Sequence, residues 1–181
     1  ELDAGSWFNP KFSNHKIPTL EEVLHFASGK IALNIEIKTE AVSDQIKNGI
    51  EEKVLQLVKE YGMQKHVLFS SFDYRAVRHF KKLDPNIPVA LLYEKTQSNR
   101  LLPHQLVEKY NVDAFNCSYR QLKRKWIADI NKFDIPAFIY TVDSKRRMQK
   151  LIAGGVTGIF TNNPDLLKSV VENYHFNSTA D

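Results

Sequence analysis

Glu36 and Lys38 are the residues whose types and spacing point most directly to chemistry. They stand two positions apart in the β-rich run 31–38. Because alternate residues of a strand face opposite sides, Asn34, Glu36 and Lys38 share one face, and the aliphatic residues between them share the other. Burying such charges is costly unless they are paired or bind a ligand. The pattern therefore predicts either a structural ion pair or a metal-binding carboxylate beside a phosphate-binding lysine.

Polar residues also stand at the carboxyl ends of the other predicted strands: Ser70 and Ser71, Tyr93 and Glu94, Asn116, Tyr140 and Asp143, Thr161 and Asn162. Two aromatic residues have alternative interpretations. Tyr140 could stack on an apolar ligand surface or fill the core. Phe8, in a polar loop, could cover a site or form a hydrophobic plug. Asp143 is better interpreted as a helix cap.

The chain offers no convincing imidazole base. None of its six histidines lies at the carboxyl end of a predicted strand, so each is interpreted as a surface or packing residue. The basic runs 123–125 and 145–147 are interpreted as solvated helix faces. The second run could instead touch an anionic membrane surface or lipid headgroup.

Six strand signals alternate with helix signals, which is typical of a parallel sheet covered by helices. The predicted strands are 31–38, 67–72, 89–93, 114–117, 137–142 and 158–161. A helix is predicted over about 43–61, and Thr19 with Glu22 has capping-box spacing. Two architectures fit, an open doubly wound sheet and a (β/α)₈ barrel. The barrel is favoured because every strand end is polar, and in a barrel all these ends meet at one mouth.

Composition restricts the class of protein. The chain has 181 residues, 43% of them hydrophobic, which suggests one domain with a sizeable core. No apolar stretch is long enough for a membrane helix. The formal net charge of +4 fits an anionic small ligand at least as well as nucleic acid. The single cysteine, Cys117, excludes an intrachain disulfide and favours a reducing, cytoplasmic location.

Six stretches, in order, resemble the glycerophosphodiester phosphodiesterase family over the C-terminal three-quarters of its barrel. They are 2–8, 17–24, 34–38, 70–72, 140–143 and 158–164. The resemblance implies a distorted (β/α)₈ barrel that hydrolyses glycerophosphodiesters to an alcohol and glycerol 3-phosphate. It also implies a divalent cation, Ca²⁺ or Mg²⁺, and a small-molecule substrate.

The resemblance also assigns roles. Glu36 matches a metal-binding carboxylate, and Lys38 matches a lysine that contacts the substrate. Tyr140 stands where the family often has tryptophan against the glycerol, so an aromatic face is kept. With Phe8 and Asn116, these residues give a predicted substrate-binding set of Lys38, Tyr140, Phe8 and Asn116.

The family's His-Arg-Gly, Pro-Glu-Asn, Glu-x-Asp and His-Asp motifs do not occur in the chain. We therefore expect six of eight βα units, with the first two strands and both catalytic histidines upstream. The missing N-terminal part would be a partner, and the chain alone would be inactive. The expected layout is a loop at 1–17, barrel units at 18–173 and a polar tail at 174–181. Neither nucleic-acid binding nor stable membrane insertion is expected.

Two other functions remain open from the sequence. One is a non-catalytic protein that binds phosphodiesters or lipid headgroups. The other is a different phosphate-handling α/β enzyme with a complete open sheet.

Overall fold

A computed structural model describes residues 2–178 and shows one six-stranded parallel sheet. Its strands lie side by side in the order of the sequence. They are β1 (Leu33–Ile37), β2 (Val67–Ser71), β3 (Val89–Leu92), β4 (Ala114–Ser118), β5 (Ala137–Tyr140) and β6 (Gly158–Ile159). All six predicted strands are confirmed, each within a few residues of the predicted ends.

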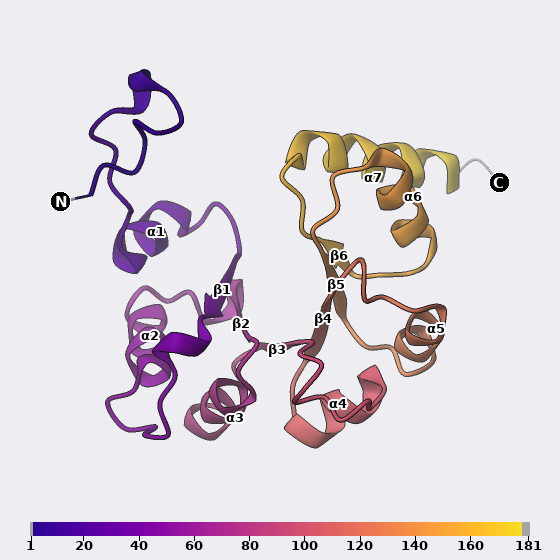
Figure 1. The fold of residues 1–181 in the computed structure, drawn as a ribbon, viewed down its shortest axis with the longest axis horizontal. Helices are drawn as coiled ribbons and strands as arrows, with labels where there is room; N and C mark the ends of the chain where they lie inside the picture. The colour runs from indigo at the N-terminus through magenta and orange to yellow at the C-terminus, as the bar shows by residue number, and fades with distance from the viewer. Residues whose placement is uncertain (1, 179–181) are drawn as a thin grey trace.

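A helix follows each strand, and one precedes the first. The helices are α1 (Leu20–Ala27), α2 (Ile50–Glu60), α3 (Tyr74–Leu83), α4 (Pro103–Tyr110), α5 (Arg124–Lys132), α6 (Lys145–Ala153) and α7 (Pro164–Ser178). Short 3₁₀ turns are η1 (Pro10–Phe12), η2 (Thr39–Ala41) and η3 (Gln64–His66). Figure 1 shows the sheet curling, with α2 to α6 arranged around its outer side.

The strand order decides between the two predicted architectures. A doubly wound sheet reverses direction at a switch point, whereas here every strand adds to the same edge as the one before it. Since parallel crossovers are right-handed, such a sheet keeps its helices on one face and curls towards a barrel. The barrel interpretation is confirmed as a half-barrel of six strands. β1 and β6 form its two edges, and each pairs with one other strand of the described chain.

The core lies between the sheet and the outer helices. Phe69 of β2 stacks on Phe80 of α3 with ring centroids 4.1 Å apart, and both side chains are buried. On the other half of the sheet, Trp126 of α5 packs edge-on against Phe115 of β4 at 5.6 Å. These contacts bury large aromatic surfaces and fix the strands on which the polar side chains of the inner face stand.

Side-chain caps set two of the helix starts. The Thr19 hydroxyl accepts from the Glu22 amide, and the Glu22 carboxylate accepts from the Thr19 amide, so the predicted capping box is confirmed. Asp73 caps α3 by accepting from the Arg75 amide at 2.9 Å. Both caps satisfy amides that have no partner within their own helix.

The predicted start of the second helix is wrong. That helix was expected from about residue 43, but α2 begins at Ile50. Asn48 has a φ of +61°, and Gly49 is the N-cap residue. A Cβ on Gly49 would lie 2.6 Å from the Gln45 carbonyl oxygen, so the chain turns tightly there. Ile46 lies before this turn, and its helical spacing from Ile50 made the predicted helix too long.

One further expectation, that Asp143 caps a helix, is corrected. Asp143 does not cap α6, whose N-cap is Ser144; its carboxylate accepts from the Asn162 amide at 2.8 Å and the Thr161 hydroxyl at 2.9 Å. These bonds, mainly the backbone one, lower the pKa of Asp143. The predicted polar tail begins within α7, since its residues 174–178 continue that helix in the described part of the chain. Its last three residues lie outside the described part.

Within residues 2–178, no helix is long and apolar enough to cross a membrane. Cys117 is fully buried in β4, and burial raises the pKa of its thiol to about 12. The thiol is therefore a packing group rather than a nucleophile. The cytoplasmic location stays a prediction.

Candidate active site

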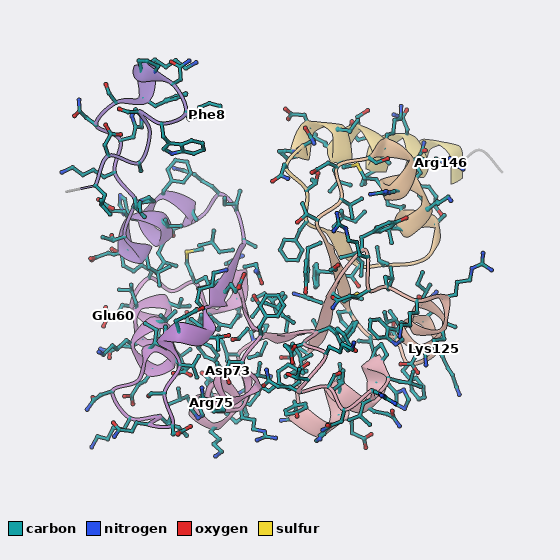
Figure 2. All side chains as sticks on the ribbon, in the orientation of Figure 1. Phe8, Glu60, Asp73, Arg75, Lys125 and Arg146 are labelled. Atoms are coloured by element: carbon teal, nitrogen blue, oxygen red, sulfur yellow. The ribbon has the colours of Figure 1, made fainter. Side chains whose placement is uncertain are left out.

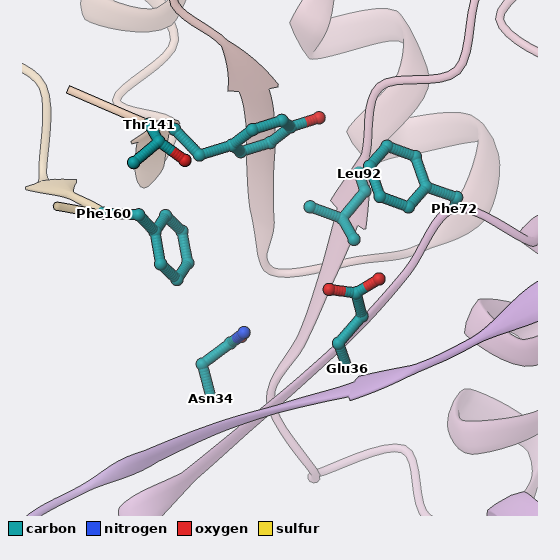
Figure 3. A pocket seen from close by; sticks show the side chains of 7 residues that line it. Asn34, Glu36, Phe72, Leu92, Thr141 and Phe160 are labelled. Carbon is teal, nitrogen blue, oxygen red and sulfur yellow. The ribbon is translucent and has the colours of Figure 1, made fainter. Parts of the chain in front are cut away.

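A cavity of about 220 Å³ lies at the carboxyl ends of the strands, on the inner face of the sheet. Its lining comes from both halves of the sheet: Asn34, Glu36, Phe72, Leu92, Tyr140, Thr141 and Phe160. Figure 3 shows Asn34 and Glu36 rising from β1 across from Thr141 and Phe160. The period-two prediction that Asn34 and Glu36 share a face is confirmed. Ligands of α/β barrels bind at this end.

Glu36 and Lys38 form an ion pair, which was one of the two interpretations of their spacing. The Lys38 ammonium donates to the Glu36 carboxylate at 2.8 Å. The Glu36 side chain is 29% exposed in the cavity, and Lys38, just beyond the end of β1, is 70% exposed. An ion pair so open to solvent adds little stability. The carboxylate and the ammonium therefore both remain accessible to a ligand.

Tyr140 forms the aromatic wall of the cavity. Its ring packs edge-on against Phe72 at 6.1 Å and against Phe160 at 6.3 Å. The hydroxyl oxygen is buried without a hydrogen-bond partner among the described residues. Burial raises the pKa of Tyr140, and Cys117 and Glu36 add to the shift. The phenol therefore stays neutral at physiological pH, and its ring face is available for an apolar ligand surface.

Two polar side chains are buried next to the cavity lining. Ser70 pairs in register with Glu36, and Asn116 with Leu92. Ser70 is 1% exposed and Asn116 is 0% exposed. The Ser70 hydroxyl and both amide atoms of Asn116 lack a partner within the described chain. Buried polar groups are normally hydrogen-bonded, so this layer is suited to a polar ligand or ordered water. Asn116 does not itself line the cavity, and its substrate contact stays a prediction.

Phe8, like Asn116 and Lys38, is a predicted site residue that does not line the cavity. It lies on the N-terminal loop, apart from the sheet, as Figure 2 shows. Its side chain is 70% exposed and packs against Trp7 and Phe12 at ring distances of 5.7 and 5.9 Å. Its substrate role stays a prediction.

The described histidine side chains lie elsewhere in the fold. None of those at positions 15, 25, 66, 79 and 104 lines this cavity. His79 contacts the buried Glu51 at 3.0 Å, and His104 contacts Asp129 at 2.6 Å. Both pairs join neighbouring helices, as packing histidines do. These positions are consistent with the interpretation of the histidines as surface or packing residues.

A divalent cation needs more ligands than residues 2–178 place together. They hold no group of three acidic, histidine or cysteine side chains suited to a metal. Glu36 is the single carboxylate that lines the cavity. Ca²⁺ binds six to eight oxygen atoms, whereas Mg²⁺ binds six and usually keeps several waters beside one or two protein carboxylates. The described residues therefore supply one carboxylate, which is only part of a site for either ion.

The apolar part of the lining was not singled out from the sequence. Phe72 follows Ser70 by two positions, and Phe160 and Leu92 stand at the ends of their strands. Thr141 directly follows Tyr140. The same alternation that selected Glu36 also selects Phe72 and Phe160, but apolar residues were assigned to the core because burial alone explains them.

Comparisons with known proteins agree with this architecture. The sequence model of the "Glycerophosphoryl diester phosphodiesterase family" matches residues 1–166. A glycerophosphodiester phosphodiesterase of Caldanaerobacter subterraneus subsp. tengcongensis is 34% identical over 172 residues, covering 94% of this chain and 68% of that protein. One from Bacillus subtilis is 35% identical over 190 residues, covering 96% of this chain and 63% of its own length.

Solved structures share the fold. A glycerophosphodiester phosphodiesterase from Parabacteroides distasonis superposes with a TM-score of 0.77 at 24% identity, covering 89% of this chain and 66% of that one. An Oleispira antarctica phosphodiesterase, solved in complex with the product sn-glycerol-3-phosphate, gives 0.75 at 24% identity, with coverage of 94% and 67%.

This chain thus spans about two thirds of the length of the proteins it matches. The family match extends over nearly the whole chain, and two relatives exceed 30% identity. The resemblance first seen in six short stretches is confirmed. The chain belongs to the glycerophosphoryl diester phosphodiesterase family.

Proposed function

We propose that this chain supplies part of an active site that hydrolyses glycerophosphodiesters to an alcohol and glycerol 3-phosphate. One observation carries the proposal. Glu36 and Asn34 of β1 face Tyr140 and Thr141, at the end of β5, across a cavity at the mouth of the half-barrel. The Oleispira antarctica neighbour was solved with sn-glycerol-3-phosphate, which supports a ligand of this class.

Lys38 and Tyr140 are proposed to contact different parts of the substrate. The Lys38 ammonium, accessible beside Glu36, suits a phosphoryl oxygen and stabilises the charge that builds up as water attacks phosphorus. The bond from phosphorus to the alcohol oxygen then breaks, and that oxygen takes a proton. Tyr140 offers its ring face to the carbon skeleton of the glycerol. The charged groups at the end of β1 would thus contact the phosphate, and the aromatic surface at the end of β5 would contact the glycerol.

Glu36 is proposed as one ligand of a Ca²⁺ or Mg²⁺ ion whose other ligands come from outside the described cavity lining. Such an ion, when bound, neutralises negative charge on the phosphoryl group. A carboxylate that faces the cavity and is only 29% exposed fits that role better than a surface acid does.

The remaining groups are proposed to come from two further strands that join β6 to β1. In the described sheet, the outer edge of β1 and the outer edge of β6 have no neighbouring strand. Beneath the candidate site, the inner face also leaves a mainly apolar hollow of about 490 Å³, lined in part by Leu68, Phe138 and Phe160. Eight strands close such a barrel, whose interior is normally filled with side chains. The proton-transferring histidines implied by the resemblance would stand on these strands.

The test uses the full-length polypeptide, meaning residues 1–181 with whatever flanking sequence the gene encodes. Release of glycerol 3-phosphate from glycerophosphocholine is measured with a coupled dehydrogenase. Replacing a metal ligand is expected to lower kcat by about 100-fold or more, so Glu36→Gln should show that loss. Glu40→Gln makes the same change at an exposed residue of η2 that does not line the cavity, and it should keep wild-type activity.

Equal activity of Glu36→Gln and wild type would remove Glu36 from the site. Full-length protein that binds glycerophosphocholine without hydrolysing it would favour the non-catalytic binding function instead.

A further inference from the structure

A second cavity, of about 380 Å³, adjoins the candidate active site. It is lined by Ser118, Tyr119, Arg120, Tyr140, Thr141 and Arg147. Tyr140 and Thr141 line both cavities, so they form a shared wall. A ligand long enough to extend past Tyr140 and Thr141 would occupy both cavities.

The second cavity is positively charged. Two of its lining residues are arginines, three others carry hydroxyl groups besides Tyr140, and none is acidic: Arg120, Arg147, Ser118, Tyr119 and Thr141. The Arg147 guanidinium lies over the Tyr119 ring, 4.9 Å from its centroid. No carboxylate of the described residues forms an ion pair with either arginine. By contrast, Arg75 is held by both Asp73 and Asp44. The cavity therefore presents cationic donors that remain available to an anion.

The position of Arg147 reinforces this charge. It lies in the first turn of α6, which holds no acidic residue and whose N-cap residue, Ser144, makes no side-chain capping hydrogen bond. A helix N-terminus carries partial positive charge, so a cation there is unfavourable unless an anion is nearby. Arg124 and Lys125 begin the neighbouring helix α5 in the same way. Figure 2 labels Lys125 and Arg146 on these two adjacent helices.

We propose that this second cavity, the basic subsite, binds a second phosphate group of the substrate. The inference rests on the proposed function and narrows its substrate class. Glycerophosphodiesters that carry an additional phosphate are preferred over those with an uncharged or cationic alcohol. Guanidinium groups bind phosphate through paired hydrogen bonds, and the hydroxyls of Ser118, Tyr119 and Thr141 can supply further donors.

A matched pair of substrates tests the proposal on the full-length polypeptide. They are glycerophosphoglycerol and the same diester with a phosphate on its terminal hydroxyl. The measured quantity is the ratio of kcat/KM for the phosphorylated substrate to that for the unphosphorylated one. This ratio should exceed one in the wild type. Arg120→Gln and Arg147→Gln should each lower it about tenfold, the loss of one charge-assisted hydrogen bond.

Arg146→Gln is the matched control. Arg146 carries the same charge in the same helical turn but does not line the basic subsite. Its ratio should equal that of the wild type. An equal loss in Arg146→Gln and Arg147→Gln would show a general surface field and overturn the subsite. A membrane role would give a different result. If Arg146→Gln and Arg147→Gln weaken binding to phosphatidylglycerol vesicles equally and leave the substrate ratio unchanged, the charges serve a membrane surface and the basic subsite is overturned.

The products separate the two halves of the substrate. Two molecules of glycerol 3-phosphate show that the alcohol half carries its phosphate into the subsite. Glycerol with glycerol bisphosphate shows that the glycerol half does so; either result supports a subsite for the second phosphate. If both diesters are hydrolysed, the ratio of their kcat/KM values is near one, and the arginine variants do not change it, the basic subsite alone is overturned. Hydrolysis of neither overturns the proposed function itself.

Discussion

At the scale of single residues, the arrangement of Glu36 and Lys38 favours a role in binding over a role in folding. Their contact is short, at 2.8 Å, but Lys38 is 70% exposed. Exposed ion pairs contribute between zero and about 1 kcal/mol to stability. The structural ion pair is thus present, and it leaves both charged groups open to a substrate.

Replacing Lys38 should therefore reduce activity and leave stability unchanged. In the full-length polypeptide, Lys38→Met should lower kcat by about 100-fold, the scale of losing one donor to a developing oxyanion. Thermal unfolding should show a change in the free energy of unfolding below about 1 kcal/mol. Lys47→Met removes the same charge from an exposed residue of the loop before α2 and serves as the control.

A different outcome would support the structural interpretation. If Lys38→Ala unfolds the protein and Lys38→Met restores both the fold and the rate, the pair serves stability.

Sequence reasoning identified Glu36 because the alternation of a strand decides which face a side chain shares. It could not place Phe8, whose position depends on the path of a loop with no repeating pattern. Nor could it show that Asn116 lies below the surface, since the depth of a residue depends on its neighbours, Leu92 and Phe138 among them. Arg147 was interpreted as part of a solvated helix face because runs of charged residues usually are, and Arg120 was not singled out.

At the scale of elements, helix starts were predictable wherever a side chain caps them. Thr19 was recognised because a capping residue acts within its own turn, and Asp73 caps α3 by the same kind of local bond. Asp143 was misassigned because a nearby acidic residue has the same local pattern, while its true partners, Thr161 and Asn162, are distant in sequence. The start of α2 was missed because apolar spacing says nothing about a left-handed residue such as Asn48.

Asp73 provides a test of element stability that depends on pH. Hydrogen bonds from the Arg75 side chain, followed by its backbone amide, hold the pKa of Asp73 below its ordinary value. A lowered carboxyl pKa stabilises the fold above the unfolded pKa of about 3.9, and this contribution is lost as the pH falls through the folded pKa. Asp73→Asn keeps a capping oxygen and removes the charge, whereas Asp73→Ala removes both.

At pH 7, Asp73→Ala should lower the free energy of unfolding by about 1 kcal/mol more than Asp73→Asn does. The difference between wild type and Asp73→Asn should shrink as the pH falls below about 4. Urea unfolding of the full-length polypeptide between pH 3 and 7 measures both. Asp44→Asn, at the exposed partner of Arg75, is the control and should have little effect. A wild-type advantage that grows with acidity would contradict the assignment.

At the scale of the whole molecule, the six strands form a sheet with two open edges and an apolar inner hollow. Open edges present unpaired amides and carbonyls to other chains. We expect residues 1–181 expressed alone to associate, and light scattering should show dimers or larger species. A monomer that melts cooperatively would contradict the proposal that further strands close this sheet.

The most direct test of the account compares the release of glycerol 3-phosphate from glycerophosphocholine by two proteins in one assay. The account predicts that the full-length polypeptide is active, loses its activity when a chelator removes Ca²⁺ and Mg²⁺, and recovers it when either ion is returned. Residues 1–181 alone should be inactive, and adding the flanking segment as a separate chain should restore metal-dependent hydrolysis. Hydrolysis by residues 1–181 alone at the full-length rate would contradict the account, because the proton-transferring groups would then lie within this chain.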